Sequence, residues 1–441
     1  MKNKNLKLVI LLMLIISPIG KDYSQSGWVQ QNSGTSLNLE AVSFLDANYG
    51  IITGENGRML KTTNGGLNWI ILSNVTNETI VDIKILNQDK VIGMFFEYPS
   101  TLRIIRTTNA GNSWNITKLD SIARTYAPGS MYFYNTDLGV ISYNNKIRYT
   151  TNGGVNWNIS SVTVSGLEFF FNDIQMVTPS IGYALGHYKI SSNNNRAEIY
   201  KTTNGCETWN YTSISFDHSD NSYETRFGFS FIDSQNAWVC GMTRQGSIGT
   251  ESYNVKTENG FTNNSVFPLI SQRFFHDCFF VNYNTGWFIG ERYVYKTSNS
   301  GLSFVSQMQN DERMNDIQFI NENTGWIVAD SGKIFKTTNG GEPIGIEIIS
   351  NETPVKYRLS QNYPNPFNPS TKFQIDIKES GNVRLNIYDI LGNEIAILIA
   401  QEMKPGTYNV DWNALNNPSG IYFYKIETKN FSETKKMVLL K

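Results

Sequence analysis

The sequence predicts an all-β chain: a seven-bladed β-propeller with an N-terminal strand closing the last blade, then a small C-terminal antiparallel β-sandwich. Three observations indicate this fold. A turn motif, first seen as KTTNGGLNW at residues 61–69, occurs seven times. Two short strand-like runs precede each copy, and after residue 356 the repeats give way to alternating runs of another kind.

The first 24 residues are typical of a signal peptide. Lys2, Lys4 and Lys7 precede nine apolar residues, Leu8 to Ile16, and small and polar residues follow. A helix needs about 20 apolar residues to cross a bilayer, and no later segment is long and apolar enough. We therefore expect an exported protein with no transmembrane segment. No cysteine lies near residues 20–24, which argues against a lipid-anchored amino terminus.

Residues 25–345 carry the repeats. The asparagine of the turn recurs at intervals of 45, 43, 52, 55, 40 and 40 residues, and periods of this size indicate propeller blades or solenoid units. Its copies are Asn64, Asn109, Asn152, Asn204, Asn259, Asn299 and Asn339. A threonine stands two places before each asparagine, and the first four copies end on Trp69, Trp114, Trp157 and Trp209.

The recurring turn has a structural explanation. An asparagine side chain can bond backbone N–H groups two residues on, and glycine accepts the positive φ of a tight hairpin. The upstream runs alternate with period two, as in Val42/Phe44 and Ile317/Phe319, which is typical of pleated strands. One repeat therefore comprises four strands with the turn closing the outer hairpin, and seven copies predict seven blades around a channel.

The seventh copy lacks an outer strand of its own. It reads KTTNGGEP, runs into Pro343 and has Ile344 where a tryptophan is expected. The segment GWVQQNSG, residues 27–34, has the spacing of a fourth strand detached from its turn. We expect it to pair with the segment near Lys333 to Lys336, which closes the ring and removes exposed sheet edges.

The turn TTNGGLNW resembles the Asp-box, Ser/Thr-x-Asp-x-Gly-x-x-Trp, of the BNR-repeat propellers, with asparagine in place of aspartate in every copy. That superfamily includes sialidases, sortilin-type receptors, xyloglucanases and the photosystem II stability/assembly-factor-like proteins. The combination of a GW strand with a KTTNGG turn most resembles the last of these families. The resemblance implies the fold and leaves the activity open, because the activities of the superfamily differ widely.

Residues 346–356 are predicted to be a linker, and residues 357–441 a small β-sandwich built from short strands. The second segment resembles the type A C-terminal sorting domain of the type IX secretion system. The matching segments are LSQNYPNPFNPST at 359–371, IYDILGNEI at 387–395, PGTYNVDWNA at 405–414, SGIYFYKI at 419–426 and KKMVLLK at 435–441.

This second resemblance implies a route and a partner. It implies export through the periplasm and across the outer membrane, with the type IX machinery recognising residues 357–441. It also implies removal of the domain during release or surface attachment. We therefore expect a secreted or cell-surface protein whose mature form begins near residues 21–26 and ends near residues 345–357.

Composition and charge exclude several classes of function. The formal net charge is -1, so no basic surface favours nucleic acid. The three cysteines occupy structural slots of the repeats without a CxxC pair, and the three histidines lie in different blades without metal-ligand spacing. No catalytic, phosphate-binding or dinucleotide motif is present. We expect neither a metal nor a cofactor.

The face of the ring opposite the turn motifs is where we expect a ligand. Arg226, Arg273 and Arg313 stand just before the inner strands of blades five, six and seven. Tyr223, Phe274 and Met314 lie beside these arginines in the sequence. Converging at the channel mouth, the arginines would suit an anionic group or a carboxylate-bearing glycan. Alternatively, they form local salt bridges with nearby carboxylates, since surface ion pairs are common. Enlarged loops at residues 187–196 and 242–253 offer a second location on this face.

Two classes of function remain. We favour a non-enzymatic binding or scaffold module for a glycan or an extracellular protein. The alternative is an extracellular glycoside hydrolase of sialidase-like or xyloglucanase-like type. An inverting hydrolase needs two carboxylates about 6.5 to 9.5 Å apart, and the sequence does not pair its candidates. These candidates are Glu168, Asp217, Asp220, Glu224 and Glu251.

Overall fold

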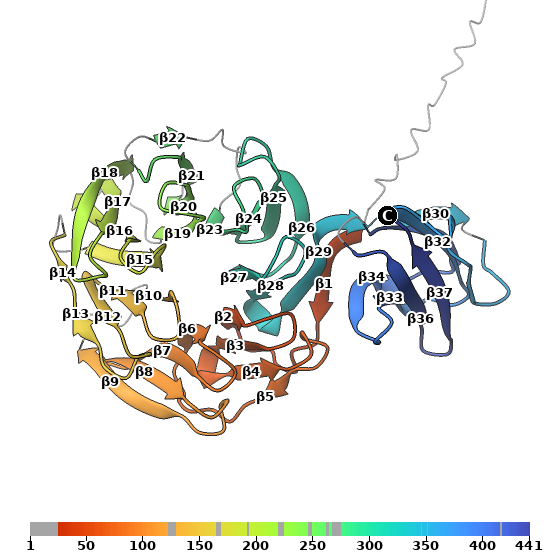
Figure 1. Cartoon of the computed structure of the whole chain (residues 1–441), viewed down its shortest axis with the longest axis horizontal. Coiled ribbons are helices and arrows are strands. Elements are labelled where there is room, and N and C mark those ends of the chain that lie inside the picture. Colours follow the sequence, from red (N-terminus) through yellow and green to blue (C-terminus); the bar gives the residue numbers. More distant parts are fainter. Residues whose placement is uncertain are drawn as a thin grey trace, which may run out of the picture.

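The chain is almost entirely β-structure in the part that the structure describes. The computed structural model describes residues 25–99, 101–121, 129–164, 169–191, 194–218, 225–245, 249–261, 264–266, 275–344, 346–350, 352–414 and 417–441. Its strands form nine sheets in these ranges, with two short 3₁₀ turns, η1 (Glu55–Gly57) and η2 (Asp330–Gly332). Figure 1 shows a ring of sheets around a central opening, with two sheets beside it. The predicted all-β propeller is confirmed.

The ring sheets follow one another along the chain. The first comprises β2 (Leu39–Phe44), β3 (Gly50–Gly54), β4 (Met59–Thr62) and β5 (Ile70–Ile71). The second comprises β6 (Ile80–Ile85), β7 (Val91–Glu97), β8 (Thr101–Thr107) and β9 (Asn115–Ser121). The third comprises β10 (Gly129–Phe133), β11 (Gly139–Tyr143), β12 (Lys146–Thr150) and β13 (Asn158–Ile159).

The fourth sheet has five strands, because β14 (Ser161–Val162) adds to its outer edge in parallel. Its other strands are β15 (Phe169–Met176), β16 (Gly182–Ser191), β17 (Asn194–Thr202) and β18 (Thr208–His218). The fifth comprises β19 (Thr225–Phe231), β20 (Ala237–Gln245), β21 (Gly249–Thr257) and β22 (Asn264–Val266). The sixth comprises β23 (Phe275–Phe280), β24 (Gly286–Gly290), β25 (Tyr293–Thr297) and β26 (Val305–Gln309).

The seventh sheet joins the two ends of the ring. It contains β27 (Met314–Phe319), β28 (Gly325–Ala329), β29 (Ile334–Ile344) and the first strand of the chain, β1 (Gln25–Gln31). β1 pairs antiparallel with β29, with Val29 opposite Lys336. This is the closure predicted from the sequence. The pairing also continues through the seventh turn motif to the end of β29, where Gln25 lies opposite Ile344.

Each turn motif is held by hydrogen bonds of the same kind. In the first copy, Thr62 Oγ1 accepts bonds from the N–H groups of Asn64 and Gly66, at 3.3 and 2.8 Å. Asn64 Oδ1 accepts a bond from the N–H of Asn68 at 3.0 Å. The predicted asparagine bond two residues on is therefore wrong. The bond reaches four residues on, because the threonine hydroxyl takes the nearer N–H groups.

The motif also docks onto the inner part of its own sheet. In all seven copies the residue after the asparagine donates its N–H to a carbonyl in the turn between the first two strands, as from Gly65 to Asn48 at 2.9 Å. Both positions after the asparagine have positive φ, even where they are occupied by Ala110, Cys206, Phe261 or Ser300. The motif is thus a structural turn on one face of the ring.

Aromatic pairs form several seams between neighbouring sheets. In each pair an aromatic ring from the second strand of one sheet stacks on a phenylalanine from the innermost strand of the next sheet. The ring centroids are 4.3 Å apart for Tyr183–Phe231, 3.7 Å for Trp238–Phe280, and 3.5 Å for both Trp287–Phe319 and Trp326–Phe44. All these rings are buried. The core of the ring therefore lies between sheets and not within one.

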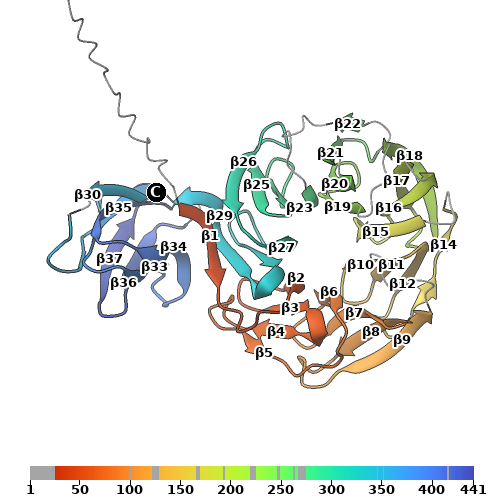
Figure 2. The ribbon, with the colours of Figure 1, turned by 180° about the vertical axis from the view of Figure 1, so that it is seen from behind.

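The two remaining sheets lie beside the ring (Figure 2). One contains β30 (Ile346–Ser350), β35 (Gly406–Asn413), β32 (Ser370–Ile377) and β31 (Arg358–Leu359). The other contains β34 (Glu394–Met403), β33 (Gly381–Tyr388), β36 (Gly420–Glu427) and β37 (Ser432–Leu439). Both contribute side chains to one hydrophobic cluster, which includes Phe373 and Leu385.

The structure differs from the predicted linker at residues 346–350. These residues form β30, which pairs with β35. Ile346 packs against the hydrophobic cluster of the carboxy-terminal sheets, which gives the segment a reason to be a strand. Of the predicted linker, residues 352–356 have no strand structure.

Candidate functional site

The inner strands begin at the face of the ring opposite the turn motifs, which we call the mouth face. In five sheets a bulge interrupts the strand pairing at this point. The inserted residues are Glu40, Val81, Asn172, His276 and Asn315. Bulges bend a strand and re-aim its side chains at a rim. The fold therefore sets an additional residue at the mouth in each of these sheets.

Four aspartates follow these bulges and occupy the same slot of their inner strands. They are Asp82, Asp173, Asp277 and Asp316. Each accepts a hydrogen bond from the N–H of the residue that follows it. Three also accept one from the next inner strand: Asp82 from Met131 at 2.7 Å, Asp173 from Phe229 at 3.1 Å and Asp316 from Val42 at 2.8 Å. These carboxylates therefore tie neighbouring sheets together around the channel.

Lys84 supplies a positive charge to this ring of aspartates. Its Nζ lies 2.9 Å from a carboxylate oxygen of Asp82. Although burial disfavours the ammonium, Asp82, Asp316 and Asp173 together raise the pKa of Lys84. Lys84 therefore stays charged and offsets part of the negative charge in the channel.

Burial acts in the opposite sense on the aspartates. It raises the pKa of Asp173 to about 6, although bonds from Ser130, Phe229 and Ile174 favour the carboxylate. It likewise raises the pKa of Asp316 to about 6, against the attraction of Lys84. The pKa of Asp277 is also raised, first by burial and then by the charges of Asp316 and Asp173. The inner strands thus hold carboxyl groups whose pKa values burial raises.

Arg313 is the predicted ligand residue that the structure describes in full. Its Nε donates to Asn315 Oδ1 at 2.7 Å and lies 3.8 Å from Asp330 Oδ2, and its Nη2 lies 3.9 Å from Glu40 Oε2. Asn315 also donates to Asp330 and to the Leu39 carbonyl. Arg313 thus belongs to a polar network that joins the seventh sheet to the first at the mouth face.

The other predicted ligand residues lie wholly or partly outside the described residues. The backbone of Arg226 is in β19, but its side chain is outside them. Tyr223, Arg273 and Phe274 lie outside them altogether, so the convergence of the three arginines stays a prediction. Met314, expected beside Arg313, is fully buried in the core between the sixth and seventh sheets. Met314 is the first residue of β27, directly after Arg313, and its side chain faces away from solvent.

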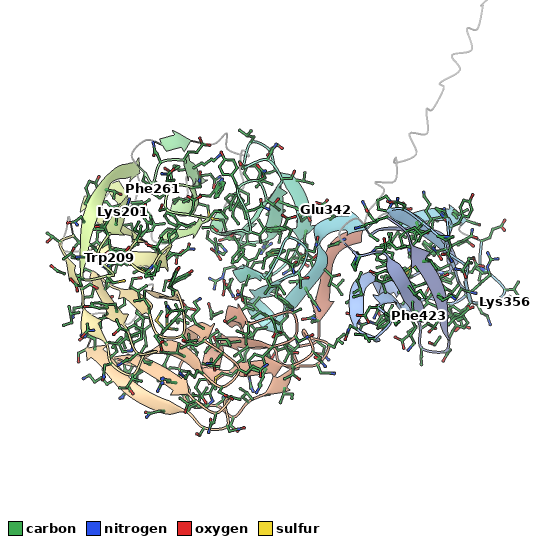
Figure 3. The ribbon with its side chains drawn as sticks, viewed as in Figure 1. Lys201, Trp209, Phe261, Glu342, Lys356 and Phe423 are labelled. Carbon is green, nitrogen blue, oxygen red and sulfur yellow. The ribbon has the colours of Figure 1, made fainter. Side chains whose placement is uncertain are left out.

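The predicted enlarged loops are mostly strand. β16 and β17 stay paired out to Ser191 and Asn194, and β20 and β21 stay paired out to Gln245 and Gly249. The long segments of the fourth and fifth sheets therefore extend their sheets as hairpins. Figure 3 shows Trp209, from the same fourth sheet, on the outer side of the ring.

A second polar cluster joins the second sheet to the third. Asp120 Oδ2 accepts bonds from the Tyr143 hydroxyl at 2.7 Å and from Lys146 Nζ at 2.9 Å, and Arg148 Nη2 lies 3.3 Å away. Although partial burial opposes the charged form, these bonds lower the pKa of Asp120 to about 2. These charged hydrogen bonds connect β9 to the β11–β12 hairpin.

The cysteines and the described histidines occupy structural positions. Cys206, Cys240 and Cys278 are buried free thiols. His187 Nδ1 lies 2.7 Å from Asn172 Oδ1, and His276 is buried. His187 in β16 and His218 in β18 belong to the same sheet, so the prediction that the three histidines lie in different blades is wrong. Within the described ranges, no group of three or more His, Cys, Asp and Glu side chains is placed to hold a metal ion.

The acidic hydrolase candidates are also beyond what the structure describes. Glu168, Asp220 and Glu224 lie outside the described residues, and the side chains of Asp217 and Glu251 do too. Sequence reasoning did not single out the channel aspartates as a set. Their signal is the recurrence of an acidic residue before an apolar one in VDI, NDI, HDC and NDI.

The carboxy-terminal part of the chain matches a known protein family. Residues 361–440 match the family profile of the secretion system C-terminal sorting domain. The match indicates export, with secretion or cell-surface attachment as the destination. Comparison with curated protein sequences finds no significant match. No helix suited to spanning a membrane occurs in the described part of the chain.

Solved propeller structures resemble the chain. YCF48 bound to D1 peptide has 16% identity and a TM-score of 0.53, over 71% of this chain and 97% of that one. YCF48 from Cyanidioschyzon merolae has 15% identity and a TM-score of 0.51, over 70% and 98%. A GH74 xyloglucanase from Xanthomonas campestris has 8% identity and a TM-score of 0.53, over 80% and 60%. At these identities the likeness shows the fold alone.

Proposed function

We propose that this chain is an exported binding module, delivered by type IX secretion, whose propeller engages a glycan or an extracellular protein on the mouth face. In this proposal residues 1–24 are the signal peptide, residues 25–345 form seven blades, and residues 357–441 are a β-sandwich recognised by the secretion machinery. The match of residues 361–440 to a sorting domain supports the export part.

The observation that carries the choice of face is the internal bonding of the turn motifs. All seven motifs dock onto the inner turns of their own sheets, and their threonine and asparagine side chains bond within the motif. Polar groups satisfied in this way have little to offer a ligand. The mouth face instead presents charged side chains from different sheets, such as Arg313 beside Glu40.

The proposed contact residues remain Arg226, Arg273 and Arg313, with Tyr223 and Phe274. A guanidinium has five N–H donors, and the short bond from Arg313 to Asn315 uses one of them. The neighbouring Glu40 and Asp330 weaken the pull of Arg313 on an anion. An acidic ligand would therefore depend on Arg226 and Arg273 as well.

A hydrolase is the weaker alternative. The raised pKa of Asp173 would suit a general acid, but its two oxygens accept bonds from Ser130 Oγ and from the N–H groups of Ile174 and Phe229. A carboxyl group engaged in this way holds the sheets together and has little freedom to exchange a proton with a substrate. The same argument applies to Asp82 and Asp316, which also accept bonds from a neighbouring sheet.

A glycan-array screen of the full chain, with a hydrolysis assay on every glycan that binds, tests the proposal. Binding without turnover is expected. An Arg313→Gln variant should bind acidic glycans more weakly, whereas a Lys61→Gln variant on the motif face should bind normally. Turnover of a bound glycan would favour the hydrolase, and equal loss in both variants would contradict the choice of face.

A further inference from the structure

The connection between the ring and the carboxy-terminal sheets is short. β29 ends at Ile344 and β30 begins at Ile346, so one residue separates the last ring strand from a strand of the other part. The sorting-domain match begins only at residue 361. β30 therefore precedes the matched residues while belonging to their sheet.

β30 is an edge strand that pairs only with β35 in the described sheet. Its pairing is antiparallel, with Ile346 opposite Val410 and Ile348 opposite Tyr408. Ile346 packs against the hydrophobic cluster of the carboxy-terminal sheets. The strand is thus held both by ladder hydrogen bonds and by a partly buried side chain.

The segment after β30 is the exposed connection in this region. Glu352, Thr353, Val355 and Lys356 are exposed, and Val355 reaches 92% exposure. Figure 3 shows Lys356 at the far end of the carboxy-terminal sheets, away from the ring. A protease needs an accessible, unpaired stretch of backbone. These residues meet that requirement, whereas β30 and β31 on either side are paired.

We propose that proteolysis within residues 352–356 leaves β30 on the propeller as a donor strand, which continues to hold residues 357–441 without a covalent bond. Water hydrolyses one peptide bond, leaving a carboxylate on the propeller and an ammonium group on the fragment. The claim that cells cut here rests on the proposed function, but retention by β30 does not. Release in the cell then requires β30 to be stripped from β35.

A second contact favours retention. β34 lies against β29 and β1 of the ring. Across this contact, burial lowers the pKa of Lys336 while Glu394 opposes that change, and burial raises the pKa of Glu394 while Lys336 opposes it. The two groups attract each other across the contact, but no hydrogen bond joins them. We assign the main hold to β30, which contributes both backbone pairing and Ile346.

Limited trypsin digestion of the full chain tests two claims: that the segment of residues 352–356 is accessible to a protease, and that the cleaved fragment stays bound. The first cut should follow Lys356, as identified by mass spectrometry, and Lys356→Gln should abolish it. The cut protein should elute as one species in native gel filtration and as two after denaturation. A first cut elsewhere would overturn the assignment of the exposed segment, and separation of the native pieces would overturn retention.

Matched variants distinguish the two contacts. After cleavage, the Ile346→Asp variant should lose the fragment of residues 357–441 at least tenfold faster than the cleaved unmodified chain. The cleaved Glu394→Gln variant should keep this fragment. The uncut Ile346→Asp chain must retain the thermal transition of the carboxy-terminal sheets. If the variant loses this transition, a competition experiment replaces it. An excess of a synthetic peptide of residues 344–352 should then displace the fragment from the cleaved unmodified chain. Equal retention by all variants, or no displacement by the peptide, would refute the donor-strand role.

Discussion

Replacing Trp28 by alanine tests how much the closing strand contributes to the ring. Trp28 is 5% exposed and meets Phe319 edge to face, with ring centroids 5.6 Å apart. It lies in the cluster between the sixth and seventh sheets. Truncating a buried tryptophan costs about 3–5 kcal/mol of unfolding free energy, a large share of the roughly 5–15 kcal/mol that stabilises a typical protein. For a domain of this size we expect the melting temperature to fall by roughly 4–8 °C.

Differential scanning calorimetry of the full chain measures this shift. Gln30→Ala is the matched control, because Gln30 lies in the same strand with an exposed side chain. That control should stay within about 0.5 kcal/mol of the unmodified protein. Deleting residues 26–34 should destabilise the ring still further. A melting temperature of the ring that does not move in either Trp28→Ala or the deletion would refute the role of β1 in closure.

Three further changes test other parts of the structure. Changing Arg226, Arg273 and Arg313 together to alanine should abolish affinity for acidic ligands and its weakening by salt while leaving the chain folded; unchanged affinity in a binding titration would move the site elsewhere. Because the pKa of Asp120 is lowered in the folded protein to about 2, its carboxylate stabilises the fold at pH values above about 4, and this stabilisation is lost as the pH falls from about 4 to about 2. Calorimetry should therefore show a smaller loss of stability over this pH range in Asp120→Asn. Ala110 has a φ of 59°, so Ala110→Gly should raise the free energy of unfolding by up to about 1 kcal/mol. A lower free energy of unfolding, measured by chemical denaturation, would contradict this.

The parts of the fold that could be predicted were those set by local pattern. The threonine and asparagine of each motif form their bonds within a few residues, so the turn is visible in every copy. The closing strand could be predicted because the seventh motif has no outer strand of its own. β30 could not, because its strand structure depends on β35, which lies about 60 residues further along the chain. Long-range pairing of this kind leaves little trace in a five-residue segment.

The candidate site was harder to predict than the fold. The sequence places Arg313 near the mouth face, but its partner Glu40 lies in the first sheet and reaches it only through ring closure. Its other partner, Asp330, directly follows β28 of the same sheet and reaches Arg313 through the pairing of β27 with β28. The hydrogen bonds that Asp82, Asp173 and Asp316 accept likewise come from inner strands of neighbouring sheets, which are distant in sequence. Whether a charged side chain is paired or available to a ligand is therefore decided by tertiary contacts, which periodicity does not report.

Both ends of the ring lie at one place on its outer edge. Gln25 in β1 is paired with Ile344, the last residue of β29. Figures 1 and 2 place the carboxy-terminal sheets beside the ring and clear of its central opening. Attachment through either end would hold the ring by its rim and leave the mouth face accessible. A ligand site at the mouth should therefore bind equally before and after removal of residues 357–441, whereas a site on the rim of the seventh sheet, which β34 contacts, should gain affinity on removal. Titrating one ligand against both forms distinguishes these two locations.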